Sequence, residues 1–173
     1  MGFLERAKAG AGAGFLAGVG IALLFLLEGL VHLRPFSIPA ALATGLLGGG
    51  SAPAAASPLD QVTSFVVVGF EVSVYGVLHL VTFAAVGAAA AFVLKVTSFW
   101  KSLWGGVAYG TLGCTGLLYV SRWFVDTPVA LDVLGLRTVL LANAVAGGII
   151  GIGLYLYRTG DVAGAASAPS PST

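Results

Sequence analysis

The sequence predicts an all-α integral membrane protein, in which four transmembrane helices form an up-down bundle with short interfacial helices in the two outer connections. Hydrophobic residues make up 58% of the 173 residues and charged residues only 9%, whereas soluble domains carry roughly 25% charged residues. Asp, Glu, Lys and Arg are absent from 9–27, 72–94, 102–121 and 138–157. Each of these stretches is close to the ~20 residues that cross a bilayer core.

The same composition excludes several other classes of protein. A net charge of +1 does not provide the basic surface that a nucleic-acid-binding protein needs, so no nucleic-acid partner is expected. The scarcity of charge also argues against a disordered chain, because such chains are rich in polar and charged residues. The single cysteine, Cys114, cannot form an intramolecular disulfide. The lipid bilayer is the expected partner, and Gly- and Ala-rich usage is compatible with a bacterial source.

Helix breakers and apolar runs set the expected element boundaries. The first span ends before Pro35 because proline cannot continue the helical hydrogen-bond ladder. The connection 34–61 begins with an apolar stretch that predicts a short interfacial or re-entrant helix and ends in a Gly-, Ser-, Ala- and Pro-rich linker. A second interfacial helix is expected at 123–136, with Thr127 as N-cap and Pro128 at its first position. The spans are expected at 9–33, 62–94 (with its membrane core near 72–94), 100–122 and 137–157.

The spans form a single predicted domain over residues 1–158, followed by a C-terminal tail at 159–173 that is expected to be disordered. Positively charged residues near the spans favour the cytoplasmic side. With both termini inside, the inner side would hold Arg6, Lys8, Lys95, Lys101 and Arg158, and the outer side would hold Arg34, Arg122 and Arg137. We therefore expect an inner-membrane protein with both termini in the cytoplasm.

Small residues recur at helical spacing in three of the predicted spans. They are Gly10, Gly14 and Gly18 in the first, Gly106, Gly110 and Cys114 in the third, and Asn143, Gly147 and Gly151 in the fourth. Helices in lipid gain little hydrophobic free energy by associating, so close contact between small residues carries their packing. The glycines predict either tight packing within one chain or, through the stripe on the first helix, a homo-oligomer.

Four ionisable residues at membrane depth are the candidate site: Glu28, His32, Glu71 and His79. Such residues are costly in lipid and usually face the bundle interior, where they are paired. If the first helix leaves the bilayer core near 33 and the second enters near 72, antiparallel packing places Glu28 beside His79 and His32 beside Glu71. A second helix that enters the core near 62 would abolish both pairs.

Three interpretations of these four residues stay open. The pairs could be structural hydrogen bonds between neutral partners, or carriers of protons or ions in a transport or proton-coupling subunit. They could also bind a metal or haem, since Glu and His are transition-metal ligands. However, Glu71 and His79 lie ~12 Å apart along one helix, and the E-x-x-H spacing of di-iron bundles is absent. No cofactor is therefore predicted.

The favoured function is a transport, proton-coupling or accessory subunit that uses the paired Glu and His. The alternatives are a structural or assembly subunit of a larger membrane complex, and a metal- or haem-binding redox module. No set of nucleophile, base and orienting residue is present, so an enzyme is not expected. Asn143, Thr111 and Thr115 could join the buried polar residues, which in membranes are usually interhelical hydrogen bonds of modest strength.

Overall fold

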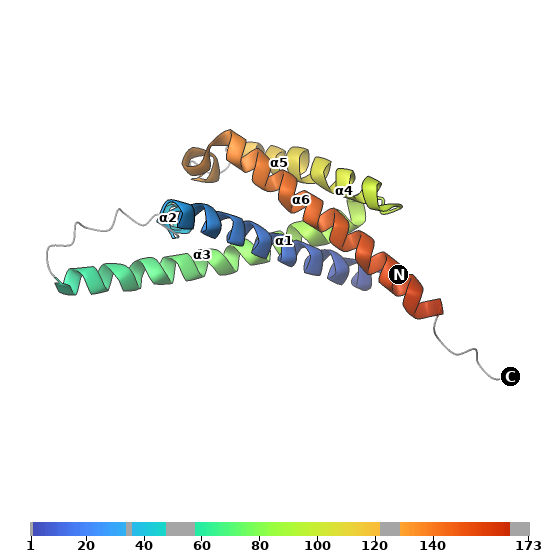
Figure 1. Cartoon of the computed structure of the whole chain (residues 1–173), viewed down its shortest axis with the longest axis horizontal. Coiled ribbons are helices and arrows are strands. Elements are labelled where there is room, and N and C mark those ends of the chain that lie inside the picture. The colour runs from blue at the N-terminus through green and yellow to red at the C-terminus, as the bar shows by residue number, and fades with distance from the viewer. Residues whose placement is uncertain (1, 34–35, 48–57, 122–128, 167–173) are drawn as a thin grey trace.

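The computed structural model describes residues 2–33, 36–47, 58–121 and 129–166, which are helical apart from short connections (Figure 1). Three helices are long: α1 (Phe3–Val31), α3 (Pro58–Val93) and α6 (Val129–Ala166). The shorter elements are α2 (Ser37–Leu47), α4 (Phe99–Ala108), the π-helical turn η1 (Tyr109–Cys114) and α5 (Thr115–Ser121).

Three described helices are long and apolar enough to cross a bilayer. The crossing segments are Phe3–Val31, Gly69–Val93 and Leu134–Gly160. Large apolar side chains such as Leu16, Val81 and Leu141 are exposed on these helices, as lipid contact requires. The chain is therefore a small multi-pass membrane protein. The predicted third span is divided among α4, η1 and α5, which follow one another without a break, and the count of four spans stays a prediction.

The observed boundaries correct several expectations. The tail was expected to be disordered from residue 159, but α6 continues through Ala166, so that prediction is wrong for the first part of the tail. The apolar stretch after the first span does form a helix, α2, which begins at Ser37. At Gly135, α6 takes a left-handed backbone with φ 73°, which separates its first turns from the main helix. The predicted capping residues Thr127 and Pro128, the 48–57 linker and residues 167–173 lie outside the described residues.

Helices α1 and α3 cross with their backbones in contact. A Cβ atom added to Gly14 would overlap the carbonyl oxygen of Phe83 and lie 2.9 Å from Gly87 Cα. A Cβ on Gly10 would lie 2.8 Å from Ala91 Cβ, and one on Gly18 would lie 3.0 Å from Phe83 Cβ. These contacts run in opposite directions along the two helices, which are antiparallel.

A second crossing joins α4 and η1 to α6. Gly106 and Gly147 face each other so closely that a Cβ on either would overlap the carbonyl oxygen of the other. Gly151 meets the backbone of Ser102 in the same way, and Gly110 meets that of Asn143. The described part of the bundle therefore consists of two antiparallel hairpins, each with its own glycine crossing.

Contacts between α1 and α6 join the two hairpins. A Cβ on Gly153 would lie 2.8 Å from Ala13 Cβ, and one on Gly20 would lie 3.0 Å from Ile149 Cδ1. Ile21 and Ile150 are the largest fully buried side chains of the core. Tyr109 adds a polar link, because its hydroxyl donates a hydrogen bond to the Val86 carbonyl of α3 over 3.0 Å.

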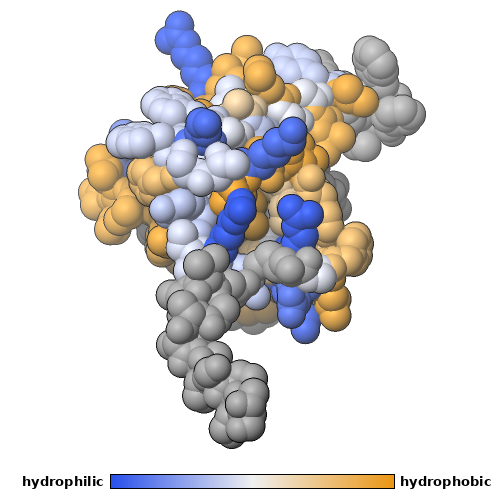
Figure 2. Space-filling view, turned by 90° about the vertical axis from the view of Figure 1, so that its right-hand side faces the viewer, coloured by the Kyte–Doolittle hydropathy of each residue, from blue (hydrophilic) through white to orange (hydrophobic). Residues whose placement is uncertain are grey.

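One end of the molecule carries a group of hydrophilic side chains. The N-terminus of α1, the connection between α3 and α4, and the far end of α6 meet there (Figure 1). Viewed from this end, the described surface carries a group of hydrophilic side chains (Figure 2). The Arg158 guanidinium donates a hydrogen bond to the Val96 carbonyl and so ties α6 to the α3–α4 connection.

We predict that Gly14→Leu destabilises the fold, because its side chain would be driven into the α3 backbone. Overpacking of this kind typically costs about 1–3 kcal/mol. Gly12→Leu is the matched control, since a Cβ there meets nothing within 4 Å. Unfolding of the detergent-solubilised variants measures the difference. Equal stability of the two variants would contradict the close α1–α3 crossing.

Candidate functional site

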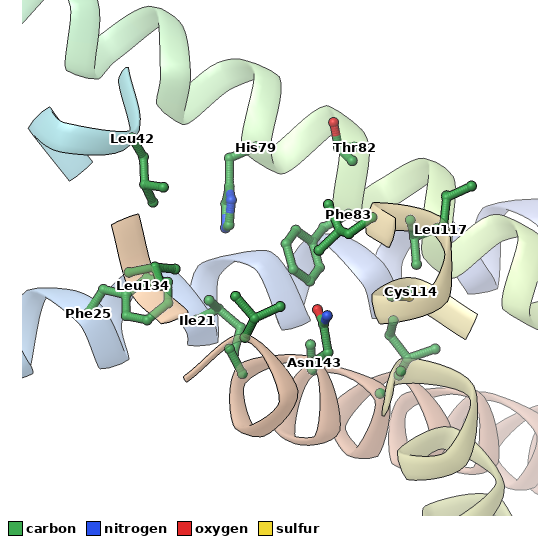
Figure 3. Close-up of a pocket in the computed structure, with 18 of the residues that line it drawn as sticks. Ile21, Phe25, Leu42, His79, Thr82, Phe83, Cys114, Leu117, Leu134 and Asn143 are labelled. Carbon is green, nitrogen blue, oxygen red and sulfur yellow. The ribbon is translucent and has the colours of Figure 1, made fainter. Parts of the chain in front are cut away.

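A cavity of about 360 Å³ lies between the two hairpins. Its walls come from α1, α2, α3, η1, α5 and α6, so every described element except α4 contributes (Figure 3). Ligand sites are typically clefts of roughly 300–1,000 Å³ with mostly apolar walls and a few polar groups. The lining follows that pattern, with Ile21, Phe25, Leu134, Val139 and Ile150 among its apolar members.

The lining of the cavity includes surface residues of α3 and α5. Thr82 of α3 and Leu117 of α5 both line it, and both are exposed on the surface of the protein.

His79 is the central polar residue of the cavity wall. It projects from α3 toward α1, where its Nε2 atom lies 3.2 Å from the Gly18 carbonyl oxygen (Figure 3). The ring lies between two aromatic neighbours on the same helix, with centroids 5.7 Å from Tyr75 and 4.6 Å from Phe83. Spacings of four residues place all three on one face of α3. A Cβ on Gly18 would contact Phe83 and Leu80, so the glycine allows α3 to approach α1 closely beside His79.

The same histidine borders a second cavity of about 290 Å³ between α1, α2 and α3. Phe25, Leu42, Tyr75 and His79 line both cavities. The second cavity has almost wholly apolar walls, which include Val19, Leu23 and Phe36. His79 thus lies where two apolar spaces adjoin.

Asn143 is the polar residue on the opposite wall. Its Nδ2 donates a hydrogen bond to Thr115 Oγ1 over 2.9 Å, and the side chain projects from α6 into the cavity (Figure 3). The π-helical turn makes this bond geometrically accessible. Ser102, Gly106 and Gly110 face α6 at spacings of four, and the wider turn then adds one residue. The next inward residue is therefore Thr115, which is 5% exposed, where the sequence spacing pointed to Cys114.

The structure does not bring Glu28 and His79 together. His79 lies against Gly18, ten residues before Glu28, which is about 15 Å along α1 at 1.5 Å per residue. Glu28 and His32 are both exposed near the end of α1. The predicted register was wrong because the helices approach at Gly14 and Gly87, whereas the prediction aligned the expected span ends.

Glu71 takes a different partner from the one expected. Thr44 of α2 donates a hydrogen bond from its hydroxyl to Glu71 Oε2 over 3.4 Å. The predicted His32–Glu71 pair did not take α2 into account. This helix packs against α3 and supplies the partner of Glu71. Among the described residues, no group of three or more His, Cys, Asp and Glu side chains is placed to hold a metal ion.

Sequence reasoning identified His79 but missed the cavity around it. The repeat Tyr75, His79, Phe83 was a usable signal, because it predicts one aromatic face of a helix. The α3 half of the first crossing was also missed, although Gly87 lies within the alanine-rich run 84–91. Neither the cavity nor the π-helical turn has a sequence signature of comparable clarity.

We predict that Asn143 and Thr115 are energetically coupled. Asn143→Leu and Thr115→Val each remove one partner, and the double variant should be more stable than the sum of the single effects implies. In double-mutant cycles of this kind, interhelical hydrogen bonds in membrane proteins average about 0.6 kcal/mol. Unfolding free energies of the four proteins in detergent measure the coupling. Strictly additive effects would show that the bond contributes nothing to stability.

Comparison of the chain with protein-family models, with curated protein sequences and with solved structures finds no match.

Proposed function

We propose that this multi-pass membrane protein crosses the inner membrane four times and binds a lipid-soluble molecule in the cavity between its hairpins, in a transport or accessory role. The observation that carries the proposal is the cavity of about 360 Å³ with His79 and Asn143 in its walls and exposed residues of α3 and α5 in its lining. An apolar cavity with a few polar groups is the usual form of a small-molecule site. The proposed role is binding without catalysis.

The fourth span would be formed by α4, η1 and α5 together. Residues 99–121 would extend for roughly 34 Å at 1.5 Å per residue, which is enough to cross a hydrocarbon core of about 30 Å. Their antiparallel contacts with α6, at Gly106–Gly147 and Ser102–Gly151, support a membrane-spanning direction. A π-helical turn is compatible with this role, because such turns occur within helices and often at functional sites.

Binding fits the described geometry better than a relay between paired Glu and His. A relay needs neighbouring carriers, whereas His79 contacts the Gly18 carbonyl and Glu71 contacts Thr44. Exposed Glu28 lies on a different part of α1. His79 is an ionisable residue at membrane depth, and it lines both cavities.

The basic residues support an orientation with both termini in the cytoplasm. Arg6, Lys8, Lys95, Lys101 and Arg158 belong to segments that meet at one end of the structure (Figure 1). Lys and Arg are enriched on the cytoplasmic side of short loops and termini.

We predict that Thr97→Cys and Thr159→Cys, each made in a Cys114→Ser background, react with a membrane-impermeant maleimide from the cytoplasmic side only. Phe36→Cys should react from the opposite side. Labelling of intact cells is compared with labelling of inverted vesicles. A three-span arrangement without residues 99–121 would place positions 97 and 159 on opposite sides, and that result would contradict the proposed topology.

We predict that an apolar photoreactive probe saturates the cavity and that a bulky side chain displaces it. The probe is a dodecyl methyl ether with a diazirine in its chain, added to proteoliposomes of the protein. Adducts on the cavity lining should saturate as the probe fraction rises, whereas adducts on outward-facing residues should rise linearly. Mass spectrometry of the labelled peptides measures both.

The matched pair for this experiment is Ala142→Trp and Leu141→Trp. Ala142 lines the cavity, whereas its neighbour Leu141 is 69% exposed on the outer face. Ala142→Trp should reduce cavity adducts several-fold, and Leu141→Trp should leave them unchanged. Linear labelling of the cavity, or equal labelling of the two variants, would contradict a binding site.

A further inference from the structure

We infer that the cavity selects an uncharged alcohol or phenol, whose hydroxyl group donates a hydrogen bond to Nδ1 of His79. This inference rests on the proposed function, because it names the class of lipid-soluble molecule that the same cavity would bind. It follows from the tautomer of His79, from the depth of that residue in the membrane and from the uncharged walls.

The contact with α1 fixes the hydrogen-bonding roles of the two imidazole nitrogens. The Gly18 carbonyl oxygen can only accept, so His79 Nε2, which lies 3.2 Å away, must carry the proton. In a neutral imidazole the other nitrogen is then an acceptor. A hydrogen bond to His79 Nδ1 therefore requires a donor group on the ligand. A ketone or an ether has no such group.

Asn143 adds a second acceptor on the facing wall. Its Nδ2 donates to Thr115, and its Oδ1 has the lone pairs of an amide carbonyl. His79 and Asn143 thus each offer an acceptor to the cavity, which is also lined by the hydroxyl-bearing residues Tyr75 and Thr82. A hydroxyl group suits this arrangement because it can donate one hydrogen bond to an acceptor, and its oxygen can also accept a hydrogen bond.

The depth of His79 excludes a charged headgroup. Gly18 and His79 lie near the middle of the crossing segments Phe3–Val31 and Gly69–Val93. Moving a charge to that depth is costly unless a counter-charge is present, and no Asp, Glu, Lys or Arg is among the described residues that line the cavity. A hydroxyl can reach the same depth at a lower cost, and the bond to His79 offsets much of it.

The apolar walls define the rest of the ligand. Phe25 and Phe83 supply aromatic surfaces, and Leu117 is an apolar residue of the lining that is exposed on the surface. The second cavity of about 290 Å³ adjoins at His79 and Tyr75. The body that accompanies the hydroxyl is therefore an alkyl, isoprenoid or aryl group.

The test compares two diazirine probes that differ by one methyl group: 1-dodecanol and its methyl ether. Both are added to proteoliposomes of the full chain at the same mole fractions, and adducts on the cavity lining are quantified. The alcohol should reach half-saturation at a mole fraction roughly two- to tenfold lower than the ether, as expected for one neutral hydrogen bond. Equal half-saturation in the unmodified protein would overturn the inference without any variant.

The protein-side test uses His79→Phe, which retains a ring between Tyr75 and Phe83 but removes the acceptor. This variant should bind the two probes equally, whereas Tyr119→Phe, which removes a hydroxyl on the exposed surface of α5 away from the lining of both cavities, should keep the preference for the alcohol. A preference that survives in a folded His79→Phe would overturn the role of His79. Saturable labelling by both probes without any preference would leave the proposed binding function intact, whereas labelling by neither would remove both proposals.

Discussion

Backbone contact between small residues is the constraint on which the rest of the structure depends. Lipid offers helices no net hydrophobic gain on association, so their packing depends on dispersion contacts and hydrogen bonds at close range. Two sites meet this condition, Gly10 and Gly14 against Gly87, and Gly106 against Gly147. Each crossing fixes one hairpin, and α1 and α6 then join the hairpins. Because α3 packs on α1 and only slightly on α6, space remains between α3 and α5, and the cavity occupies it.

The membrane fold was predictable from the sequence because apolar length and charge placement respond directly to the bilayer. The three long crossing segments and the short helix α2 lie where the uncharged stretches and the Pro-flanked apolar run predict them. The end of α6 was not predictable in the same way. The Gly-, Ser- and Pro-containing tail 159–173 was expected to be disordered, but α6 continues to Ala166. Glycine residues only weaken a helix, and they do not oblige it to stop.

The candidate site was predictable only in part, and the reason is register. His79 could be identified because an ionisable side chain inside an apolar stretch is expensive. Its partner could not, because the expected depth of Glu28 was taken from the span ends, whereas glycine contacts fix the actual alignment. The hydrogen-bond partner of His79 Nε2 is the carbonyl oxygen of Gly18, which belongs to the backbone. A backbone acceptor leaves no mark in the sequence, and cavities between helices leave none either.

The π-helical turn at Tyr109–Cys114 has a consequence for the shape of the cavity wall. Such a turn accommodates one residue more than an α-helical turn. If η1 closed into regular α-helix, the residues after it would rotate by about 100° around the helix axis. Cys114 would then face Asn143 in place of Thr115, and Leu117 and Leu118 would turn away from the positions they hold in the cavity wall. The outline of the cavity therefore depends on a single additional residue in the backbone of one turn.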